Sequence, residues 1–189
     1  MRRVPLILAI SCAVLAVVAL VQLPIHSSAQ APAFPAREPV VKAAAFWSAT
    51  GVKPGGEITL ALALDIRKPY HINPNKTKEP FIPTTVEILE APNELRSSTP
   101  IFPEPETIDF GAGAAKERIS VFTGRTVFYM PMAVTEAAKP GEHEVKIKVG
   151  YQACDDKQCL FPTDLTETVK LAVVDPSAKV EKANAEMFQ

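Results

Sequence analysis

The sequence predicts an all-β fold, an immunoglobulin-like antiparallel β-sandwich. Three observations predict it: apolar residues alternate with period two, turn residues separate the alternating runs, and no amphipathic stretch of helical length lies between them. Without crossover helices, an antiparallel arrangement is favoured over a parallel sheet. The 18 prolines fit this fold if they lie in connections or on edge strands, because proline cannot donate to a sheet ladder.

Five runs are typical of strands, and in the clearest two every second residue is apolar. These two runs are residues 57–66, with Ile58, Leu60, Leu62 and Leu64 on one parity, and residues 144–151, with Val145, Ile147, Val149 and Tyr151. The other runs are residues 84–90, 125–134 and 168–174. Met130 and Met132 share a parity in the run 125–134, and we predict that they pack in the core.

The chain begins with two arginines and a long apolar run that ends in small residues, a pattern typical of a secretory signal peptide over residues 1–29. The apolar run is also long enough for a retained membrane anchor, and that alternative stays open. Lipid attachment at Cys12 is disfavoured, because this cysteine lies inside the apolar run.

The rest of the chain divides into three parts. Residues 30–42 are rich in proline and alanine and predict an extended linker. Residues 43–175 form the predicted sandwich domain, and its connection at residues 91–124 is long, with a short strand at 119–122. Residues 176–189 form a charged tail that we expect to be frayed or briefly helical.

Charge and composition exclude several function classes. Cleavage after Ala29 removes Arg2 and Arg3, so that 18 of the 20 basic residues remain against 21 acidic ones. No basic patch is present, which argues against nucleic-acid binding. No glycine-rich phosphate loop and no short-spaced Cys and His cluster is present either, so we predict no cofactor and no metal.

Two cysteines remain in the predicted mature chain, Cys154 and Cys159, in the stretch "GYQACDDKQCLFP". A four-residue turn between them would place them opposite each other in a hairpin, at Cα separations of about 4.5–5.5 Å that a disulfide accepts. Strict alternation from Val145 puts Cys154 on the wetter face of its strand, unless a bulge at Gly150 shifts the parity. Asp155 and its neighbouring acidic residue disfavour the thiolate form.

Spacing alone favours a plain structural disulfide over a redox-active pair. However, a short loop gains little stability from closure, and an accessible pair that closes a tight loop is suited to exchange. Both readings stay open at this point.

Three stretches, "YQACDDKQCLFP", "KPYHINPN" and "IFPEPETIDFGAG", resemble the N-terminal periplasmic domain of the thiol:disulfide interchange protein DsbD and its free-standing relatives, the disulfide-bond corrector domains. The resemblance spans residues 46–174 and implies an immunoglobulin-like fold in the periplasm. It also implies thiol:disulfide oxidoreductase activity, with a thioredoxin-like domain or membrane electron conduit as donor and periplasmic disulfide-containing proteins as recipients. The family is linked to cytochrome c biogenesis.

Residue by residue, the resemblance implies that Cys154 and Cys159 are the redox pair and that Cys159 forms the mixed disulfide. It aligns Asp109 and Phe110 with a loop that caps the pair, with Phe110 as the shield, and Tyr70 and His71 with an aromatic stretch beside the pair. Each has a simpler alternative.

Phe110 fits an ordinary loop anchor, Tyr70 fits the core, and His71 fits either a proton donor or a solvated loop histidine. The spacing between the cysteines is one residue shorter than in the best-known member, and no thioredoxin-like domain or membrane conduit is part of this sequence.

Two other function classes remain. One is an immunoglobulin-like envelope adaptor whose disulfide only pins a recognition hairpin. The other is copper handling through Met, His and Cys ligands, which the scarcity of histidines disfavours.

Overall fold

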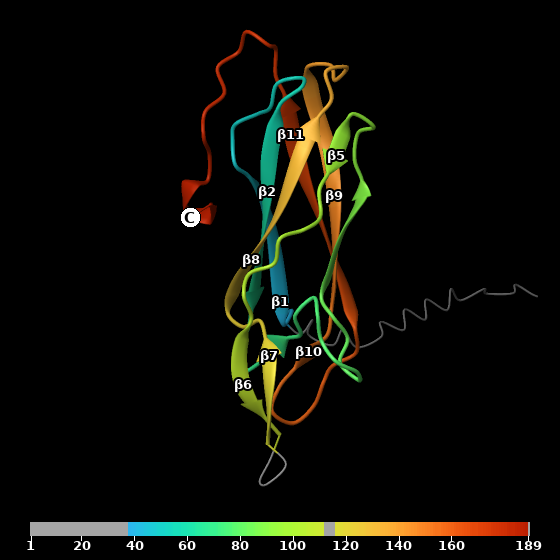
Figure 1. The fold of residues 1–189 in the computed structure, drawn as a ribbon, viewed down its shortest axis with the longest axis vertical. Helices are drawn as coiled ribbons and strands as arrows, with labels where there is room; N and C mark the ends of the chain where they lie inside the picture. The colour runs from blue at the N-terminus through green and yellow to red at the C-terminus, as the bar shows by residue number, and fades with distance from the viewer. Residues whose placement is uncertain (1–37, 112–115, 189) are drawn as a thin grey trace, which may run out of the picture. The chain divides into compact units, whose positions relative to one another are not determined.

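A computed structural model describes residues 38–111 and 116–188 of the chain. The predicted signal peptide and residues 30–37 of the predicted linker lie outside the described residues. The described part consists of antiparallel sheets, which confirms the predicted β-sandwich (Figure 1). Within it, the single helical element is a short 3-10 turn, η2 (Ala185–Met187), and no helix there has the length and apolar character to cross a membrane.

The first large sheet has the strand order β1-β2-β8-β5. Its strands are β1 (Val41–Trp47), β2 (Glu57–Ile66), β8 (Arg125–Val134) and β5 (Leu95–Ser97). The bounds of β2 and β8 are those that the alternating pattern predicts. The fold begins two residues before its predicted start, because Val41 is already buried and pairs with Ile66.

The second large sheet has the order β11-β9-β4 and consists of β11 (Thr163–Val173), β9 (Gly141–Tyr151) and β4 (Thr85–Glu90). A register shift lies in β4 between Ile88 and Glu90, and not at Gly150 as considered from the sequence. Gly150 leaves room for two neighbouring side chains instead. A Cβ there would lie 2.8 Å from the hydroxyl of Thr85 and 3.0 Å from the carboxylate of Asp164, so these side chains would have to shift to admit another residue.

The core lies between these sheets, where each strand contributes every second residue. Met130 and Met132 belong to it, which confirms their predicted packing role. Because one face of each strand is buried, the period-two pattern fixes which residues point inward. The largest fully buried side chains are those of Phe128, Leu60, Leu62, Leu64, Ile72, Met132, Ile147, Leu171, Val41, Val121, Val145 and Val149.

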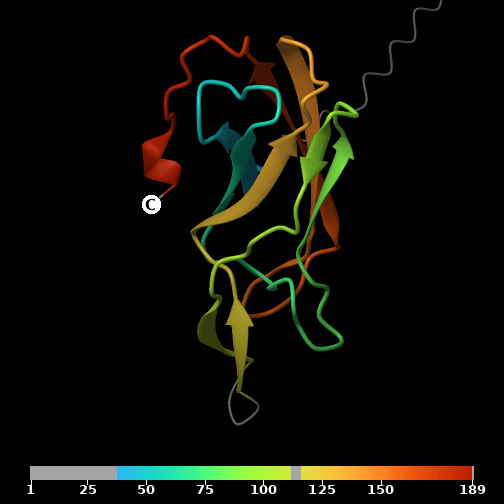
Figure 2. The ribbon, with the colours of Figure 1, turned by 45° about the horizontal axis from the view of Figure 1, so that its top comes forward.

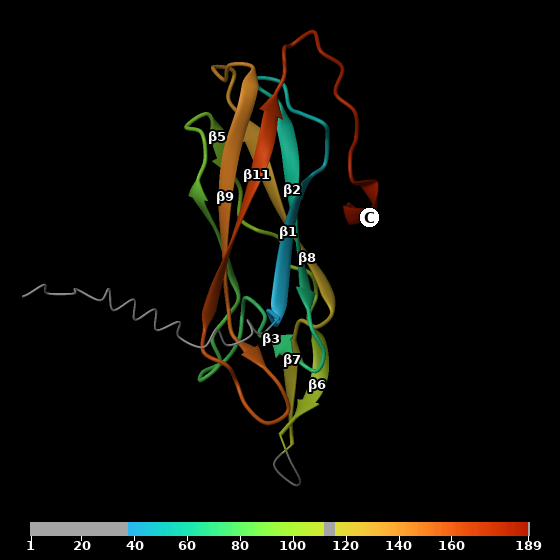
Figure 3. The ribbon, with the colours of Figure 1, turned by 180° about the vertical axis from the view of Figure 1, so that it is seen from behind.

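The edges of the two large sheets are joined at β1 and β11, which lie side by side when the molecule is seen from behind (Figure 3). The indole Nε1 of Trp47 in β1 donates a hydrogen bond of 2.9 Å to the carbonyl of Lys170 in β11. Val52 also exchanges backbone hydrogen bonds with residues of β11 and its end, at Ala172 and Val174. These contacts close one side of the sandwich.

Two small two-stranded sheets lie together at one end of the sandwich (Figures 1 and 3). One pairs β10 (Ala153–Cys154) with β3 (His71–Ile72). The other is the hairpin of β6 (Glu106–Phe110) and β7 (Glu117–Val121), and β7 overlaps the short strand predicted in the long connection. The two small sheets are linked to each other, because Ile72 of β3 exchanges backbone hydrogen bonds with Phe122, the residue after β7.

The C-terminal tail is not frayed, which corrects the expectation from its charge. It runs back along the outside of the first sheet, beside β2 (Figure 2). Met187 packs on Ala61 and Ala63, the outward-facing residues of β2, and the hydroxyl of Tyr129 donates a 2.7 Å hydrogen bond to the carbonyl of Met187. The tail is therefore part of the folded domain.

Candidate functional site

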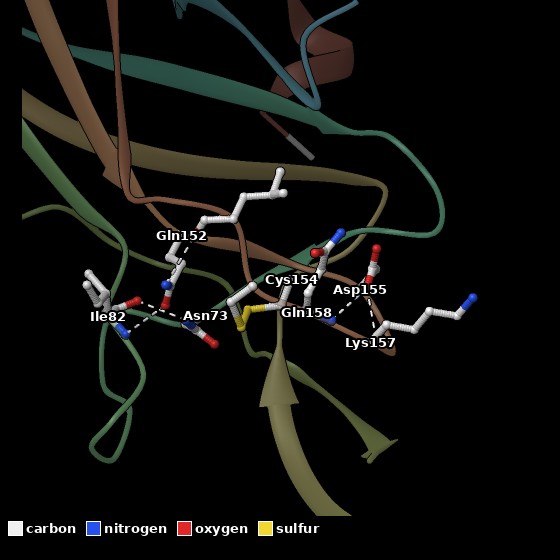
Figure 4. Close-up of a disulfide and its surroundings, with 9 residues drawn as sticks. Asn73, Ile82, Gln152, Cys154, Asp155, Lys157 and Gln158 are labelled. Carbon is white, nitrogen blue, oxygen red and sulfur yellow. Dashed lines mark hydrogen bonds between the residues drawn. A yellow bond between two sulfur atoms is a disulfide. The ribbon is translucent and has the colours of Figure 1, made fainter. Parts of the chain in front are cut away.

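Cys154 and Cys159 form a disulfide at the end of the sandwich, with an S–S distance of 2.03 Å (Figure 4). The two residues face each other as an antiparallel bridge, as the hairpin prediction requires. Their Cα atoms are 3.9 Å apart, closer than the separation of about 4.5–5.5 Å expected for opposed strands.

The turn between the cysteines is organised by Asp155. Its carboxylate accepts hydrogen bonds from the backbone N–H groups of Lys157, at 2.8 Å, and Gln158, at 2.9 Å, while its own N–H donates to the carbonyl of Gln158. These backbone bonds to the charged form lower the pKa of Asp155. On the other side of the disulfide, the N–H of Leu160 donates to the carbonyl of Ala153, so the hairpin is held on both sides.

The two sulfur-bearing residues differ in exposure. Cys154 is 0% exposed, whereas Cys159 is an exposed residue. The prediction that Cys154 lies on the wetter face is therefore wrong. The alternation of β9 ends at Tyr151, and after Gln152 the chain enters β10, where Ala153 and Cys154 are both buried against β3. Cys159 is therefore the residue of the pair that solvent reaches, and Cys154 is not.

His71 lies directly opposite Cys154 in the ladder of β3 and β10. It is 3% exposed, so the reading of a solvated loop histidine is wrong. Burial lowers the pKa of His71, although the carboxylates of Asp156 and Asp155 act in the opposite direction. The imidazole is accordingly neutral at pH 7, and its Nε2 is buried with no hydrogen-bond partner among the described residues.

Phe110, at the end of β6 in the neighbouring hairpin, contacts His71. Its half-buried ring stands edge-on to the ring of His71, with centroids 5.6 Å apart, and edge-on to Phe81 at 6.1 Å. The hairpin thus brings Phe110 onto the imidazole that faces Cys154.

The other two predicted residues are not brought to the disulfide by any described contact. Asp109 is exposed, alternates in side from Phe110 along β6, and pairs with Arg118 of β7. Tyr70 is half-buried against the core, and the guanidinium of Arg67 lies 5.9 Å from its ring centroid.

Gln152 is a site residue that the sequence did not single out. Its side-chain amide accepts a hydrogen bond from the N–H of Ile82 at 3.4 Å and donates one to the carbonyl of Leu160 at 3.2 Å (Figure 4). Asn73, itself buried, donates to the carbonyl of Ile82 at 3.0 Å. These bonds tie the loop that carries Phe81 and Ile82 to the segment after Cys159. In the sequence Gln152 appears only as the glutamine of "YQAC", and its polarity does not distinguish it from a surface glutamine.

Phe161 is the second such residue, because its side chain is 92% exposed two positions after Cys159. Ile82, on the loop bridged by Gln152, is exposed as well. An exposed aromatic side chain therefore lies two residues from Cys159 in the sequence. Among the described residues, no three His, Cys, Asp or Glu side chains are grouped so that they could hold a metal ion.

Fold and site together define a β-sandwich domain with a half-exposed, half-buried disulfide at one end. A solved structure with this fold is the N-terminal periplasmic domain of ScsB from Proteus mirabilis, at a TM-score of 0.50 and 11% identity. The match covers 74% of this chain and 50% of that one, so this chain spans about half the length of that structure. At this identity the likeness concerns the fold alone.

Two weaker structural matches carry no functional argument. One is a family 123 glycoside hydrolase from Clostridium perfringens, with a TM-score of 0.39, 11% identity, and coverage of 72% of this chain and 28% of that one. The other is AggA, the major subunit of aggregative adherence fimbriae type I from Escherichia coli, with a TM-score of 0.30, 10% identity, and coverage of 70% and 96%. The sequence matches no protein-family model and no curated protein.

Proposed function

We propose that this chain is a periplasmic thiol–disulfide exchange protein that passes electrons from a thioredoxin-like donor to disulfide-containing periplasmic proteins. The observation that carries the proposal is the asymmetric disulfide, in which Cys159 is exposed and Cys154 is 0% exposed. With only one of the two cysteines at the surface, a partner would approach the disulfide from the side of Cys159, and thiol–disulfide exchange depends on such access. The fold shared with a periplasmic domain of ScsB supports the location.

The exchange follows from this asymmetry. A donor thiolate attacks the sulfur of Cys159, the Cys154–Cys159 bond breaks, and Cys154 leaves with the electron pair and takes up a proton. A second donor thiolate then attacks the donor sulfur of the mixed disulfide and releases Cys159, so the donor ends as a disulfide. Delivery to a substrate is the reverse, in which Cys159 attacks the substrate disulfide and Cys154 resolves the mixed disulfide. Two electrons and two protons move in each half.

In this proposal Phe110 limits unwanted exchange. Its ring packs edge-on against His71, which pairs with Cys154, so the cover lies on the buried side of the disulfide and not over Cys159. Phe110→Ala removes this cover while it leaves both cysteines in place. We expect the variant to be reduced faster by glutathione because Cys154 becomes a second point of attack, and an unchanged rate would assign Phe110 a packing role alone.

Two variants and one equilibrium measurement test the function itself. Cys154→Ser leaves the accessible cysteine without its resolving partner, and we expect it to trap mixed disulfides with periplasmic proteins. Cys159→Ser is the matched control, which has an equally free thiol but a buried one, and it should trap none. A reduction potential below about −300 mV, together with no trapped partner, would contradict the proposal, because that is the range of structural disulfides.

An envelope adaptor is the second candidate, and the 92% exposure of Phe161 favours it, since exposed aromatic residues commonly anchor partners. A protein in which both cysteines are replaced by alanine separates the two. It loses all exchange under the first function, and it retains partner binding under the second.

A further inference from the structure

His71 is a buried polar residue that the exchange described above does not use. It belongs to β3, and its partner across the ladder is Cys154. Side chains of directly opposed residues lie on the same face with Cβ atoms about 4.5–5.5 Å apart, which an imidazole and a thiol can span. The imidazole Nε2 has no hydrogen-bond partner within the part of the chain that the structure describes. A buried donor or acceptor without a partner is costly and calls for an explanation, and a partner that forms in another state of the protein is one such explanation.

The other state is the reduced one. When the disulfide opens, the leaving sulfur of Cys154 carries a negative charge in a place that is 0% exposed to solvent. Burial of an unpaired charge is unfavourable, and the charge of Asp155 on the adjoining turn adds to the cost. The leaving group therefore needs a donor from inside the protein.

We propose that His71 is that donor, through a hydrogen bond from its Nε2–H to the sulfur of Cys154 that forms as the disulfide opens. The inference rests on the proposed exchange and deepens it. The bond that breaks is Cys154–Cys159, the bond that forms joins Cys159 to the donor sulfur, and the electron pair goes to Cys154. His71 stabilises that thiolate, which then takes one proton from water, and the imidazole is neutral before and after.

The surroundings of His71 fit this role. Phe110 packs edge-on against the imidazole from β6, and Phe81, from the loop before β4, packs on Phe110. Neither ring can ionise or accept the Nε2 proton as a partner of comparable strength. The titratable groups that act on the imidazole are the carboxylates of Asp155 and Asp156, from the turn after β10. Burial outweighs them and keeps the ring neutral in the disulfide state, so a new negative charge at Cys154 is the change that would draw its N–H into a bond.

The first test uses the protein with its own His71. Nitrogen NMR of ¹⁵N-labelled histidines is recorded on the disulfide form and on the form reduced with dithiothreitol. We expect the Nε2 resonance of His71 to move on reduction, while the resonances of His143, on β9 and bonded to Lys139, stay unchanged. Imidazole resonances of His71 that are the same in both forms would overturn the inference.

The second test measures the leaving group. In a Cys159→Ser background, the ultraviolet absorbance of the thiolate is titrated with pH in proteins with His71, His71→Gln and His71→Leu. Loss of a hydrogen bond to a charged group predicts about a tenfold smaller thiolate population in His71→Leu at a given pH, and glutamine, which keeps an N–H donor, should restore part of it. In the two-cysteine protein, His71→Leu should slow reduction by dithiothreitol about tenfold, since a less stabilised leaving thiolate departs more slowly.

Equal thiolate populations and equal reduction rates in the His71 and His71→Leu proteins would overturn the inference. His143→Leu is the matched control and should change neither quantity. A purely structural imidazole would alter unfolding without a glutamine rescue of the thiolate, and that result also counts against the proposal. None of these measurements needs a physiological partner, so a failure to trap mixed disulfides with Cys154→Ser would refute the exchange function separately.

Discussion

The unequal burial of the two cysteines predicts unequal reactivity once the disulfide is reduced. Cys159 should react with a small alkylating reagent as an exposed thiol, because its residue is accessible in the folded protein. Cys154 is 0% exposed and should react only when β10 separates from β3. The ratio of the two alkylation rates therefore reports the free energy of that local opening.

The magnitude follows from the contacts that opening breaks. Release of β10 from β3 and from the segment after Cys159 loses the pairing with β3 and the backbone bond from Leu160 to Ala153, or about two hydrogen bonds at about 1 kcal/mol each. Exposure of the buried Ala153 and Cys154 adds about 1 kcal/mol. A total of about 3 kcal/mol corresponds to a rate ratio of roughly a hundred.

The assay is alkylation of the reduced protein with iodoacetamide, quenched at intervals and read by mass spectrometry of the two cysteine-containing peptides. The same reaction in denaturant provides the intrinsic rate of each thiol and removes differences that the fold does not cause. A ratio in the folded protein within threefold of the ratio in denaturant would show that reduction releases Cys154. The asymmetric mechanism would then have to be abandoned.

Three further outcomes follow from other residues. Asp156→Asn removes an exposed negative charge beside the disulfide but none of the turn's described hydrogen bonds, so reduction by an anionic thiol should be up to about fivefold faster, and 0.5 M salt should erase the difference. Burial raises the pKa of Glu167, which lies between two inward-facing apolar residues of β11, so its contribution to stability is present below its unfolded pKa and lost as pH rises through the folded pKa. Glu167→Gln should therefore be more stable than the parent at pH 7 and lose that advantage at pH 4, in urea unfolding at both pH values. Met187→Ala should lower the free energy of unfolding by about 2 kcal/mol and Tm by roughly 4–8 °C in calorimetry, whereas no change would mean that the tail is not docked in solution.

The strands were predictable because the residues of a half-buried strand alternate between the core and solvent, which gives the sequence an apolar residue at every second position. The bounds of β2 and β8 match the alternating runs, since every second residue there faces one core. The docked tail also had a signal that the charge of residues 176–189 concealed. Residues 60–64 are apolar on both parities, as in a strand that is covered on both faces, and Ala61 and Ala63 are the positions that Met187 covers.

The environment of the cysteines was not predictable in the same way. The alternating pattern predicts facing only within one strand, and β9 ends at Tyr151, three residues before Cys154. The burial of Cys154 then depends on pairing with His71, which lies far away in the sequence on a strand of two residues that leaves no periodic pattern. His71 was identified only through resemblance, and its burial follows from the same pairing. The site is thus built from long-range contacts of short segments, which local sequence patterns do not encode.

The disulfide contributes little to the stability of the fold, because it closes a short loop at one end of the sandwich. The bond closes a loop between residues only five apart in sequence, for which loop-closure entropy predicts about 2 kcal/mol. The sandwich is held elsewhere, by the core between the large sheets and by Trp47, whose indole joins β1 to β11. A protein with alanine at both Cys154 and Cys159 should therefore stay folded, with Tm lowered by roughly 4–8 °C.

The loss of stability without the disulfide should be compared with the loss in Trp47→Ala. Loss of a buried aromatic side chain costs about 3–5 kcal/mol, so calorimetry should rank it as more damaging than removal of the disulfide. The opposite ranking would make the disulfide a structural staple, because a bond that the fold cannot lose cannot be opened in each exchange cycle. The predicted ranking leaves the protein free to alternate between dithiol and disulfide while the sandwich stays intact.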